Sequence, residues 1–231
     1  MMGSTYGQFC PVAKAMELLD ERWTMLLVRE LVAGSEHFND LRRGLPRMSP
    51  SLLSKRLQQL ERAGVLEKLV VGNDVRYVLT PAGLELRPVV EAVGSWGARW
   101  IGEIGDRDLD PKLLLWDIRR HLLREPIPSS RSVVEFLFPE LGAQQKHWWL
   151  VLGPDDIDLC SDDPGHEVDL LVTSSLRTLT QVWIGQRTWD WALGSGQVTV
   201  TGPEHLRRAL PEWLALSEFA AVERGGTEVR V

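Results

Sequence analysis

The chain has 231 residues, of which 44% are hydrophobic and 25% are charged, and its formal net charge is −6. This length allows one large domain or two ordinary domains, each with its own core. Two cysteines allow at most one disulfide, and the sequence has neither a signal-like apolar start nor a run of eighteen apolar residues, so we expect a cytoplasmic protein with no membrane partner.

Charge is divided unevenly along the chain. Residues 1–105 carry 13 Lys and Arg against 12 Asp and Glu, whereas residues 106–231 carry 13 against 20. Seven of the ten tryptophans also lie beyond residue 105. These shifts predict two domains, 1–105 and 106–231. The acidic total does not exclude nucleic-acid binding, because the local field of the docking face steers a protein to DNA.

Three helices are expected in the first 44 residues, over Val12–Leu19, Glu21–Ala33 and about Phe38–Arg43. Asp20 can cap the second of them with its side chain. The apolar stripe expected to bury this second helix consists of Trp23, Leu26, Leu27 and Leu31.

A fourth helix is predicted over 49–63. Ser49 can cap its first amides, Pro50 suits the first helical position, and Gly64 suits a left-handed helix end. At 100° per residue, one stripe for the core contains Leu53, Leu57 and Leu60. The opposite stripe and its borders carry polar side chains: Ser51, Ser54, Lys55, Gln58, Gln59 and Arg62.

Two β-rich runs follow, Val65–Val71 and Val75–Leu79, joined by the turn residues Gly72-Asn73-Asp74. A capped second helix followed by a hairpin is typical of winged helix-turn-helix proteins, in which that helix enters the DNA major groove. Between Leu41 and Leu60 the sequence has no acidic residue and five basic ones: Arg42, Arg43, Arg47, Lys55 and Arg56.

A solvated polar face is the alternative explanation of these charges. The cap, the hairpin and the missing acids together favour a double-stranded DNA partner. Gln can pair with adenine, Lys can contact guanine or phosphate, and Ser can contact either kind of group. The candidate DNA-binding residues are Arg42, Arg43, Arg47, Ser49, Ser51, Ser54, Lys55, Gln58, Gln59, Asn73 and Arg76.

A long helix is expected from Thr80-Pro81 to about Ile104. It has more apolar residues than one small winged domain can cover, and such a surface usually marks an interface. Pairing with the same helix of a second copy, as a homodimer, is the simplest use of the surface, and docking against the second domain is the alternative. The residues are Leu84, Val89, Val90, Val93, Trp96, Trp100 and Ile101.

The first hundred residues resemble the HxlR family, winged-helix transcription regulators related to the MarR group. The resemblance rests on Cys10-Pro11-Val12-Ala13-Lys14-Ala15, Arg22-Trp23-Thr24, Phe38-Asn39-Asp40-Leu41, Ser49-Pro50, Leu53-Ser54, Arg56-Leu57 and Tyr77-Val78-Leu79-Thr80. It implies a homodimer on a pseudo-palindromic operator, with helix 49–63 in the groove and the hairpin near Asn73–Arg76 on the flanking DNA. The hairpin tip departs from the family in lacking its usual proline.

The second half reads as an α+β domain with a mainly antiparallel sheet and its helices on one face. Helices are expected from Asp110-Pro111 to about Arg124, over Ser175–Gly185 and Trp189–Leu193, and from Gly202-Pro203 to about Leu216. The strands are expected at Val133–Phe138, Trp148–Leu152, Ile157–Cys160, Val168–Thr173 and Gln197–Thr201.

Residues 112–216 resemble a sterol-carrier-protein-like domain, through Gly185, Trp191-Ala192, Gly194-Ser195-Gly196, Val198, Val200, Gly202 and Leu210. The resemblance implies an apolar tunnel between sheet and helices, which in several relatives holds a lipid-like molecule. A small hydrophobic effector is therefore the expected partner, although the tryptophans can equally fill that space as plain core. The candidate wall residues are Phe136, Trp149, Leu179, Trp183 and Trp191.

No catalytic site, cofactor or metal is expected. The five histidines have no zinc-like spacing, and no phosphate-cradling loop or nucleophile elbow is present. Cys10, beside Pro11 at a helix start, is either a small buried residue or an oxidant-sensing thiol. The sequence thus favours a ligand-responsive DNA-binding regulator. A redox-responsive regulator with a scaffold or protein-binding second domain, and a lipid-carrier accessory protein, are the alternatives.

Overall fold

The computed structural model describes residues 5–101, 104–123, 131–153 and 156–225. Contacts between residues divide the chain into two compact units, Met1–Trp96 and Gly97–Val231. The division falls inside the helix that precedes the expected boundary at Gly105, so the second unit begins earlier than the composition suggested. Within the described ranges, no helix combines the length and the apolarity that are needed to cross a bilayer.

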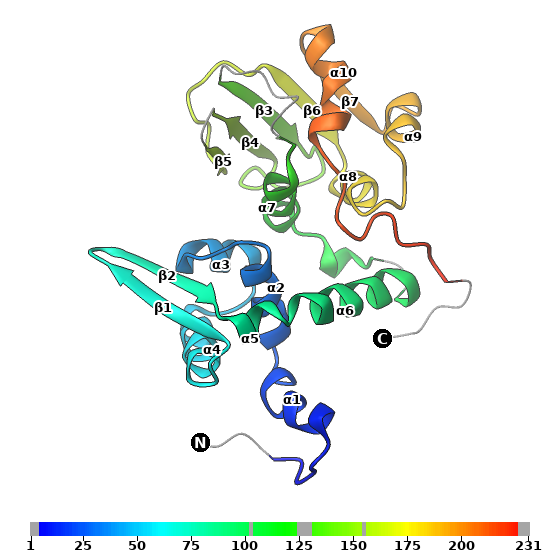
Figure 1. Cartoon of the computed structure of the whole chain (residues 1–231). Coiled ribbons are helices and arrows are strands. Elements are labelled where there is room, and N and C mark those ends of the chain that lie inside the picture. Colours follow the sequence, from blue (N-terminus) through cyan, green and yellow to red (C-terminus); the bar gives the residue numbers. More distant parts are fainter. Residues whose placement is uncertain (1–4, 102–103, 124–130, 154–155, 226–231) are drawn as a thin grey trace. The chain divides into compact units, whose positions relative to one another are not determined.

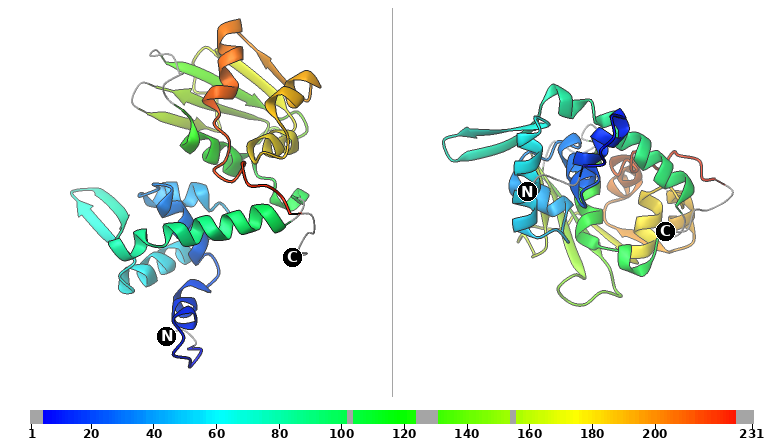
Figure 2. Two further views of the ribbon diagram at one scale, coloured as in Figure 1. Left: turned by 45° about the vertical axis from the view of Figure 1, so that its right-hand side comes forward. Right: turned by 90° about the horizontal axis from the view of Figure 1, so that it is seen from below.

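The first unit is a group of helices from which a two-stranded hairpin projects (Figures 1 and 2). The strands pair antiparallel from Leu66↔Leu79 to Val71↔Asp74. The helices and strands, of which the last helix crosses the unit boundary, are α1 (Pro11–Leu19), α2 (Thr24–Val32), α3 (Phe38–Gly44), α4 (Pro50–Arg62), β1 (Leu66–Val71), β2 (Asp74–Leu79), α5 (Pro81–Leu84) and α6 (Arg87–Trp100).

The start of α2 differs from the sequence-based prediction. Asp20 does not cap this helix but ends α1, and its carboxylate accepts a hydrogen bond from the Tyr6 hydroxyl at 2.6 Å. Helix α2 begins only at Thr24, because Trp23 adopts φ = 78°, a left-handed conformation that interrupts the helix. Leu26, assigned to the apolar stripe, is 42% exposed.

The prediction of a single long helix after Thr80 is wrong, because this segment forms two helices. Thr80 caps α5 as expected, and its side chain accepts from the Gly83 amide at 3.2 Å. The chain then leaves helical geometry at Glu85 and Leu86 before α6 begins at Arg87. Pro88 explains the break, since it has no amide hydrogen to donate to the preceding turn and its ring crowds the carbonyl of that turn. The predicted end crosses residues 102–103, which lie outside the described ranges.

The core of the first unit joins one face of each central helix to the base of the hairpin. Leu53, Leu57 and Leu60 of α4 are at most 2% exposed, as the stripe predicted. They belong to a buried cluster with Leu27, Val28, Leu31, Leu41, Leu45, Met48, Val65, Leu66 and Val90. The position of α4 therefore depends on burial of its apolar stripe.

The second unit is an α+β domain. A short 3₁₀ turn over Asp106–Asp108 precedes its first helix. The predicted end of that helix, Arg124, lies outside the described residues. The other elements are α7 (Pro111–His121), β3 (Ser132–Leu137), β4 (His147–Leu152), β5 (Ile157–Cys160), β6 (Leu170–Ser174), α8 (Leu176–Trp183), α9 (Trp189–Gly194), β7 (Val198–Thr201) and α10 (Glu204–Trp213).

The five strands form one mixed sheet in the order β5-β4-β3-β6-β7. Three of the neighbouring pairs are antiparallel, but β3 and β6 run parallel. Phe136 pairs with Trp148 on one side and Val172 on the other, and these three side chains share one buried cluster with residues of α7, α8, α9 and α10. The helices thus cover one face of the sheet (Figure 1).

We predict that Gly83→Ala lowers the free energy of unfolding by about 1–3 kcal/mol, the usual cost of overpacking. A Cβ at Gly83 would lie 2.1 Å from the main-chain oxygen of Val65, which accepts from the Thr80 amide and therefore cannot move freely. Gly97→Ala in α6 is the control, because its Cβ would meet no atom within 4 Å. Thermal unfolding followed by circular dichroism measures both, and an equal midpoint for the two variants would contradict the prediction.

Candidate nucleic-acid interface

Helix α4 presents a polar stripe on the side opposite its leucines. Ser51, Lys55, Gln58 and Arg62 are all exposed and recur three or four residues apart, so they share one face. Ser54, at the border of this face, is half-buried. The polar stripe expected from the sequence is therefore present on one helix, α4, whose two ends are clearly defined.

The start of α4 is fixed by the predicted cap. The Ser49 side chain accepts from the Leu52 amide at 3.3 Å, and Pro50 occupies the first helical position. The hydroxyls of Ser49 and Ser51 lie 3.2 Å apart. Gly64, with φ = 73°, follows the C-terminal end of the helix. The Ser49 hydroxyl thus serves the helix itself, and it leaves Ser51 as the more available hydroxyl at this end.

Two residues of α4 are engaged inside the protein: the DNA-binding candidate Gln59, and Arg56, which belongs to the basic run but was not a candidate. Arg56 is only 6% exposed, its Nε donates to the Arg22 carbonyl at 3.2 Å, and its Nη2 pairs with Glu21. Its Nη1 donates to the Gln59 side chain at 2.5 Å. Arg56 therefore joins α4 to the segment before α2, and Gln59 supports it. Nothing in the sequence distinguished Arg56 from the neighbouring Lys55 except its place beside the leucine stripe.

The arginines around α3 have different surroundings. Arg42 is exposed. Arg43 is half-buried and donates to the Asp40 carboxylate at 3.1 Å. Arg47, on the turn between α3 and α4, is exposed. Asp40 lies just before the basic run in the sequence and contacts Arg43. The net positive charge at this end of α3 is therefore smaller than the number of basic residues in the run suggests.

The hairpin tip is organised around Asp74. The Arg76 Nε donates to the Asp74 carboxylate at 2.7 Å, and the His37 Nε2 lies 3.0 Å from the same carboxylate. The Arg76 guanidinium, and next to it His37, hold the pKa of Asp74 below its ordinary value. Asn73 is fully exposed beside this group. The negative charge of Asp74, which would otherwise repel a DNA phosphate near the tip, is thus compensated within the protein.

His37 and Glu36 are contributors that the sequence-based argument missed. The Glu36 carbonyl accepts from the Tyr77 amide at 2.8 Å, and a Glu36 carboxylate oxygen lies 3.8 Å from Arg76. The segment before α3 therefore holds the second strand of the hairpin. Residues 36 and 77 are far apart in the sequence and no local pattern links them, so the sequence alone could not predict this hydrogen bond.

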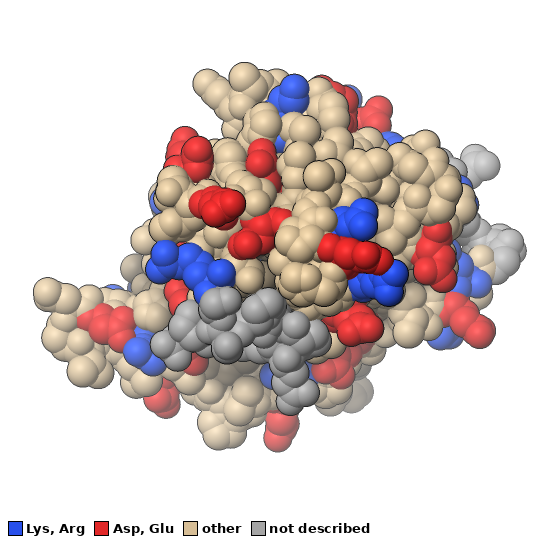
Figure 3. All heavy atoms as spheres, turned by 90° about the horizontal axis from the view of Figure 1, so that it is seen from above, with Lys and Arg blue, Asp and Glu red and all other residues tan. Residues whose placement is uncertain are grey.

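Charges of both signs are interspersed on the face of the molecule seen in Figure 3, without a large patch of either sign. The uneven distribution along the sequence therefore does not become a single acidic surface there.

The five residues proposed as walls of an apolar cavity do not lie together. Phe136, Leu179 and Trp183 belong to one tightly buried cluster. Trp149 pairs with Glu135, which places it on the opposite face of the sheet from Phe136, and Trp191 is 39% exposed. The alternation in β4 was assigned with the wrong phase, because both Trp148 and Trp149 are apolar and only the register decides between them.

The two cysteines lie in different units of the chain. Cys10 is half-buried directly before α1, and Cys160 is half-buried at the end of β5. Among the residues with described positions, no group of three or more His, Cys, Asp or Glu side chains could hold a metal ion.

Replacing Arg56 with Met should lower the free energy of unfolding by about 1.5–3 kcal/mol, the contribution of hydrogen bonds to a charged group. The matched control is Lys55→Met on the neighbouring residue, which is exposed and should change stability by less than about 0.5 kcal/mol. Urea unfolding of both variants makes the comparison. Equal losses of stability would mean that the Arg56 pair does not hold α4.

Comparison with known proteins supports one family for the first part of the chain. The family model described as HxlR-like helix-turn-helix matches residues 18–104. The chain is 35% identical over 99 residues to the uncharacterized HTH-type transcriptional regulator YvaP of Bacillus subtilis, which covers 41% of this chain and 92% of YvaP. It is 33% identical over 97 residues to the uncharacterized HTH-type transcriptional regulator YtfH of Escherichia coli, covering 41% and 77%.

Among solved structures, the reduced form of the transcriptional regulator YodB from B. subtilis is 30% identical, covers 39% of this chain and 92% of that chain, and has a TM-score of 0.35. The range matched by the family model, residues 18–104, contains both the capped α4 and the hairpin. The chain belongs to the HxlR-like helix-turn-helix family of transcription regulators.

Proposed function

We propose that the protein is a homodimeric regulator that binds a pseudo-palindromic operator, with α4 in the major groove and the hairpin on the flanking DNA. The exposed polar stripe of α4 is the observation that carries this proposal. Lys55 and Gln58 are exposed one turn apart on a helix whose other face is fully buried. Such side chains can read guanine and adenine edges.

The base-contact prediction is tested with Lys55→Ala and Gln58→Ala. Each should weaken binding to the operator by about 1–3 kcal/mol, the range for a good base contact, while binding to unrelated DNA changes little. Arg42→Ala should weaken both kinds of DNA and lower the salt dependence, because a phosphate contact carries no sequence information. Fluorescence anisotropy at several salt concentrations measures these effects.

Lys112→Ala, an exposed lysine at the start of α7 in the second unit, is the control and should leave DNA binding unchanged. Operator affinity equal to that of the unaltered protein in both the Lys55 and Gln58 variants would show that this face of α4 is not the recognition surface.

Dimer formation is supported by apolar side chains that the first unit leaves uncovered. Helix α1 buries only Leu19, whereas Val12 is 67% exposed and Met16 is 36% exposed. On α6, Val93 is 57% exposed and Trp96 is 48% exposed. Exposed apolar surface on this scale is typical of interfaces, and a second copy is the occupant that a two-fold operator requires.

We predict that Val93→Asp converts the dimer to monomer and weakens operator binding at least tenfold. A dimer has to place two recognition helices roughly 34–36 Å apart on the DNA, which a monomer cannot do. Glu91→Gln on the same helix is the control, since Glu91 is exposed and polar. Sedimentation velocity at micromolar concentration gives the oligomeric state, and a monomeric unaltered protein would rule out the dimer.

The second unit is proposed to respond to a small molecule and to pass that signal to the DNA-binding unit. Its five-stranded sheet with helices on one face supports the resemblance to sterol-carrier-like domains. A ligand alters operator binding only through different affinities for the binding and non-binding arrangements of the dimer. A hydrophobic effector between sheet and helices would have to displace the buried cluster around Phe136 and Trp183.

A response to oxidants through Cys10 is the second candidate. The observation behind it is a free, half-buried thiol at the N-terminal end of α1, the helix that carries part of the uncovered apolar surface. Diamide should then lower operator affinity of the unaltered protein and of Cys160→Ser, but not of Cys10→Ser. Operator affinity that is insensitive to diamide, with Cys10 still open to alkylation, would eliminate this candidate.

A further inference from the structure

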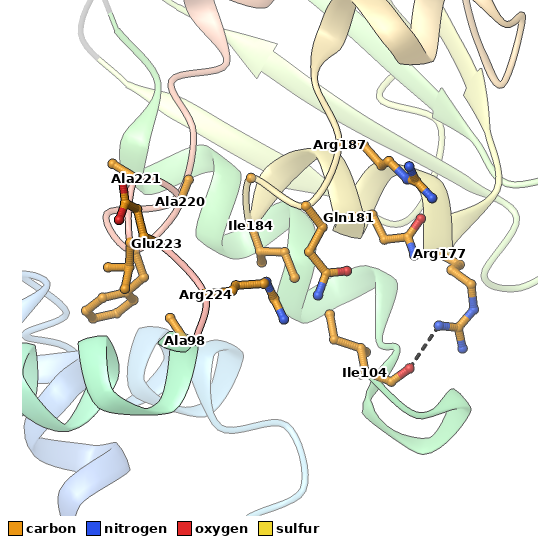
Figure 4. Close-up of a pocket in the computed structure, with 14 residues that line it drawn as sticks. Ala98, Ile104, Arg177, Gln181, Ile184, Arg187, Ala220, Ala221, Glu223 and Arg224 are labelled. Carbon is orange, nitrogen blue, oxygen red and sulfur yellow. Dashed lines mark hydrogen bonds between the residues drawn. The ribbon is translucent and has the colours of Figure 1, made fainter. Parts of the chain in front are cut away.

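A pocket of about 710 Å³ lies in the second unit, on the side of α8 that faces away from the sheet (Figure 4). Its lining residues come from the end of α6, the segment before α7, α8 with the loop after it, and the segment 219–224. All of them belong to the unit Gly97–Val231. None of the five residues expected to wall an apolar cavity lines it.

The sequence builds this pocket from the outer face of an amphipathic helix. Leu176, Leu179 and Val182 of α8 are buried in the core. Arg177 and Gln181 lie on the other side of the helix, four residues apart, and both line the pocket. The face of α8 that does not pack on the sheet therefore forms one wall.

The segment after α10 forms the opposite wall and is held at both ends. The Ser217 amide donates to the Trp183 carbonyl at 3.0 Å, and the Gly225 amide donates to the Arg99 carbonyl at 2.8 Å. Between these points the segment passes so close to Gly185 that a Cβ there would lie 2.4 Å from the Ala220 carbonyl oxygen. Gly185 also has φ = 75°, so both the close contact and the backbone conformation require glycine at this position. The pocket is thus a preformed part of the fold.

The charged lining is mainly basic. Arg177, Arg187 and Arg224 line the pocket, against the single acid Glu223. In Figure 4, Arg177 and Arg187 lie on the α8 side and Arg224 projects from the opposite segment. A guanidinium presents paired N–H donors that fit a carboxylate with two parallel hydrogen bonds. Arginines on two walls are therefore suited to hold one anionic group between them.

The present partners of these arginines leave donors available to a ligand. Arg177 donates to the Ile104 carbonyl at 2.9 Å and to Asp106 at 2.5 Å, but the Asp106 side chain is 94% exposed and this pair is weak. The Arg187 guanidinium lies 4.6 Å from the centre of the Trp191 ring, a contact that uses its face and not its edge. When the Gln186 side-chain amide is oriented with its oxygen toward Arg224, that oxygen accepts from the guanidinium at 2.5 and 3.2 Å.

Apolar side chains complete the lining: Ile104, Ile184, Phe219 and Val222. The volume lies in the range of small-molecule sites, which combine apolar walls with a few placed polar groups. We propose that this pocket binds a small organic anion, a carboxylate attached to an apolar body. The ligand class is thus charged at one end, in contrast to the neutral lipid-like effector that the sterol-carrier resemblance implies.

The pocket also gives a route to regulation, and this part rests on the proposed function. Ala98 of α6 lines the pocket, and Arg99 holds the end of the opposite wall. The same helix carries Val93 and Trp96, which are proposed to form the dimer contact. A carboxylate that draws the two walls together would act on the end of the dimerisation helix.

The experiment measures binding of 2-naphthoate and of decanoate to the full-length protein by isothermal titration calorimetry. The neutral amides of the two acids are the ligand controls. We expect at least one acid to bind, its amide to bind at least tenfold more weakly, and Arg187→Gln and Arg224→Gln each to weaken binding of the acid about tenfold, because each removes a charged donor. Arg208→Gln on α10 is the protein control, since Arg208 is 80% exposed and pairs with Glu204 outside the pocket.

Absence of binding by both acids at millimolar concentration would overturn the proposal, as would equal affinities of acid and amide. Unchanged affinity in both arginine variants would also overturn it. Operator affinity measured with the bound acid tests regulation alone: a change supports the route through α6, and no change overturns that route. Loss of the proposed DNA function would appear separately, as failure to bind the operator in the absence of any ligand.

Discussion

The burial of three leucines on α4 sets the orientation on which the candidate DNA-binding surface depends. Leu53, Leu57 and Leu60 are at most 2% exposed, and each fully buried leucine contributes about 1.5–3 kcal/mol relative to exposure. A turn of the helix by one residue would place Ser54 and Gln58 in the core in the positions of Leu53 and Leu57. The rotation of α4 is therefore fixed by hydrophobic burial, and Arg56 reinforces it from the side.

In each unit, one face of an amphipathic helix packs on the core and the other face is left for a different role. On α4 the uncovered face carries polar groups on a convex surface, as a helix that enters a groove requires. On α8 the uncovered face is roofed by the segment after α10 and becomes one wall of a pocket. The interior of the second unit is filled by the cluster around Phe136 and Trp183. Space for a ligand is found outside the core, between a helix and a main-chain strap.

The sequence predicted nearly every element, because most of them have strong local signals. Ser49-Pro50, Thr80-Pro81 and Asp110-Pro111 all begin helices, and each capping side chain accepts the expected amide. The α5–α6 break was predictable from Pro88 but was outweighed by the continuous apolar pattern around it. The left-handed conformation of Trp23 was not predictable, since bulky residues rarely adopt positive φ and the sequence has no glycine there to mark it.

Some features of the candidate site follow from local sequence patterns, and others depend on contacts between segments that are distant in the sequence. The face of α4 followed from periodicity alone. The acidic partners of Arg56 and Arg76, which are Glu21 and Glu36, come from segments about 35 to 40 residues away, and no local pattern reveals them. In β4 both Trp148 and Trp149 fit a buried strand, so only the pairing with β3 could show which of them faces the helices.

The hairpin has a further consequence for the protein when it is not bound to DNA. The outer edge of β1 has no further strand beside it in the two-stranded sheet, whereas β2 is held at Tyr77 by the Glu36 carbonyl, and open edges invite pairing with other chains. Val70 and Val71 are 60% and 76% exposed on β1, which adds apolar surface to such an edge. Glu67 and Lys68 lie on the same strand, and charged side chains at an edge oppose this pairing. The hairpin that is suited to lie against DNA is thus also a segment through which free copies of the protein can associate, and the balance between these two apolar and two charged side chains affects the concentration at which the free protein aggregates.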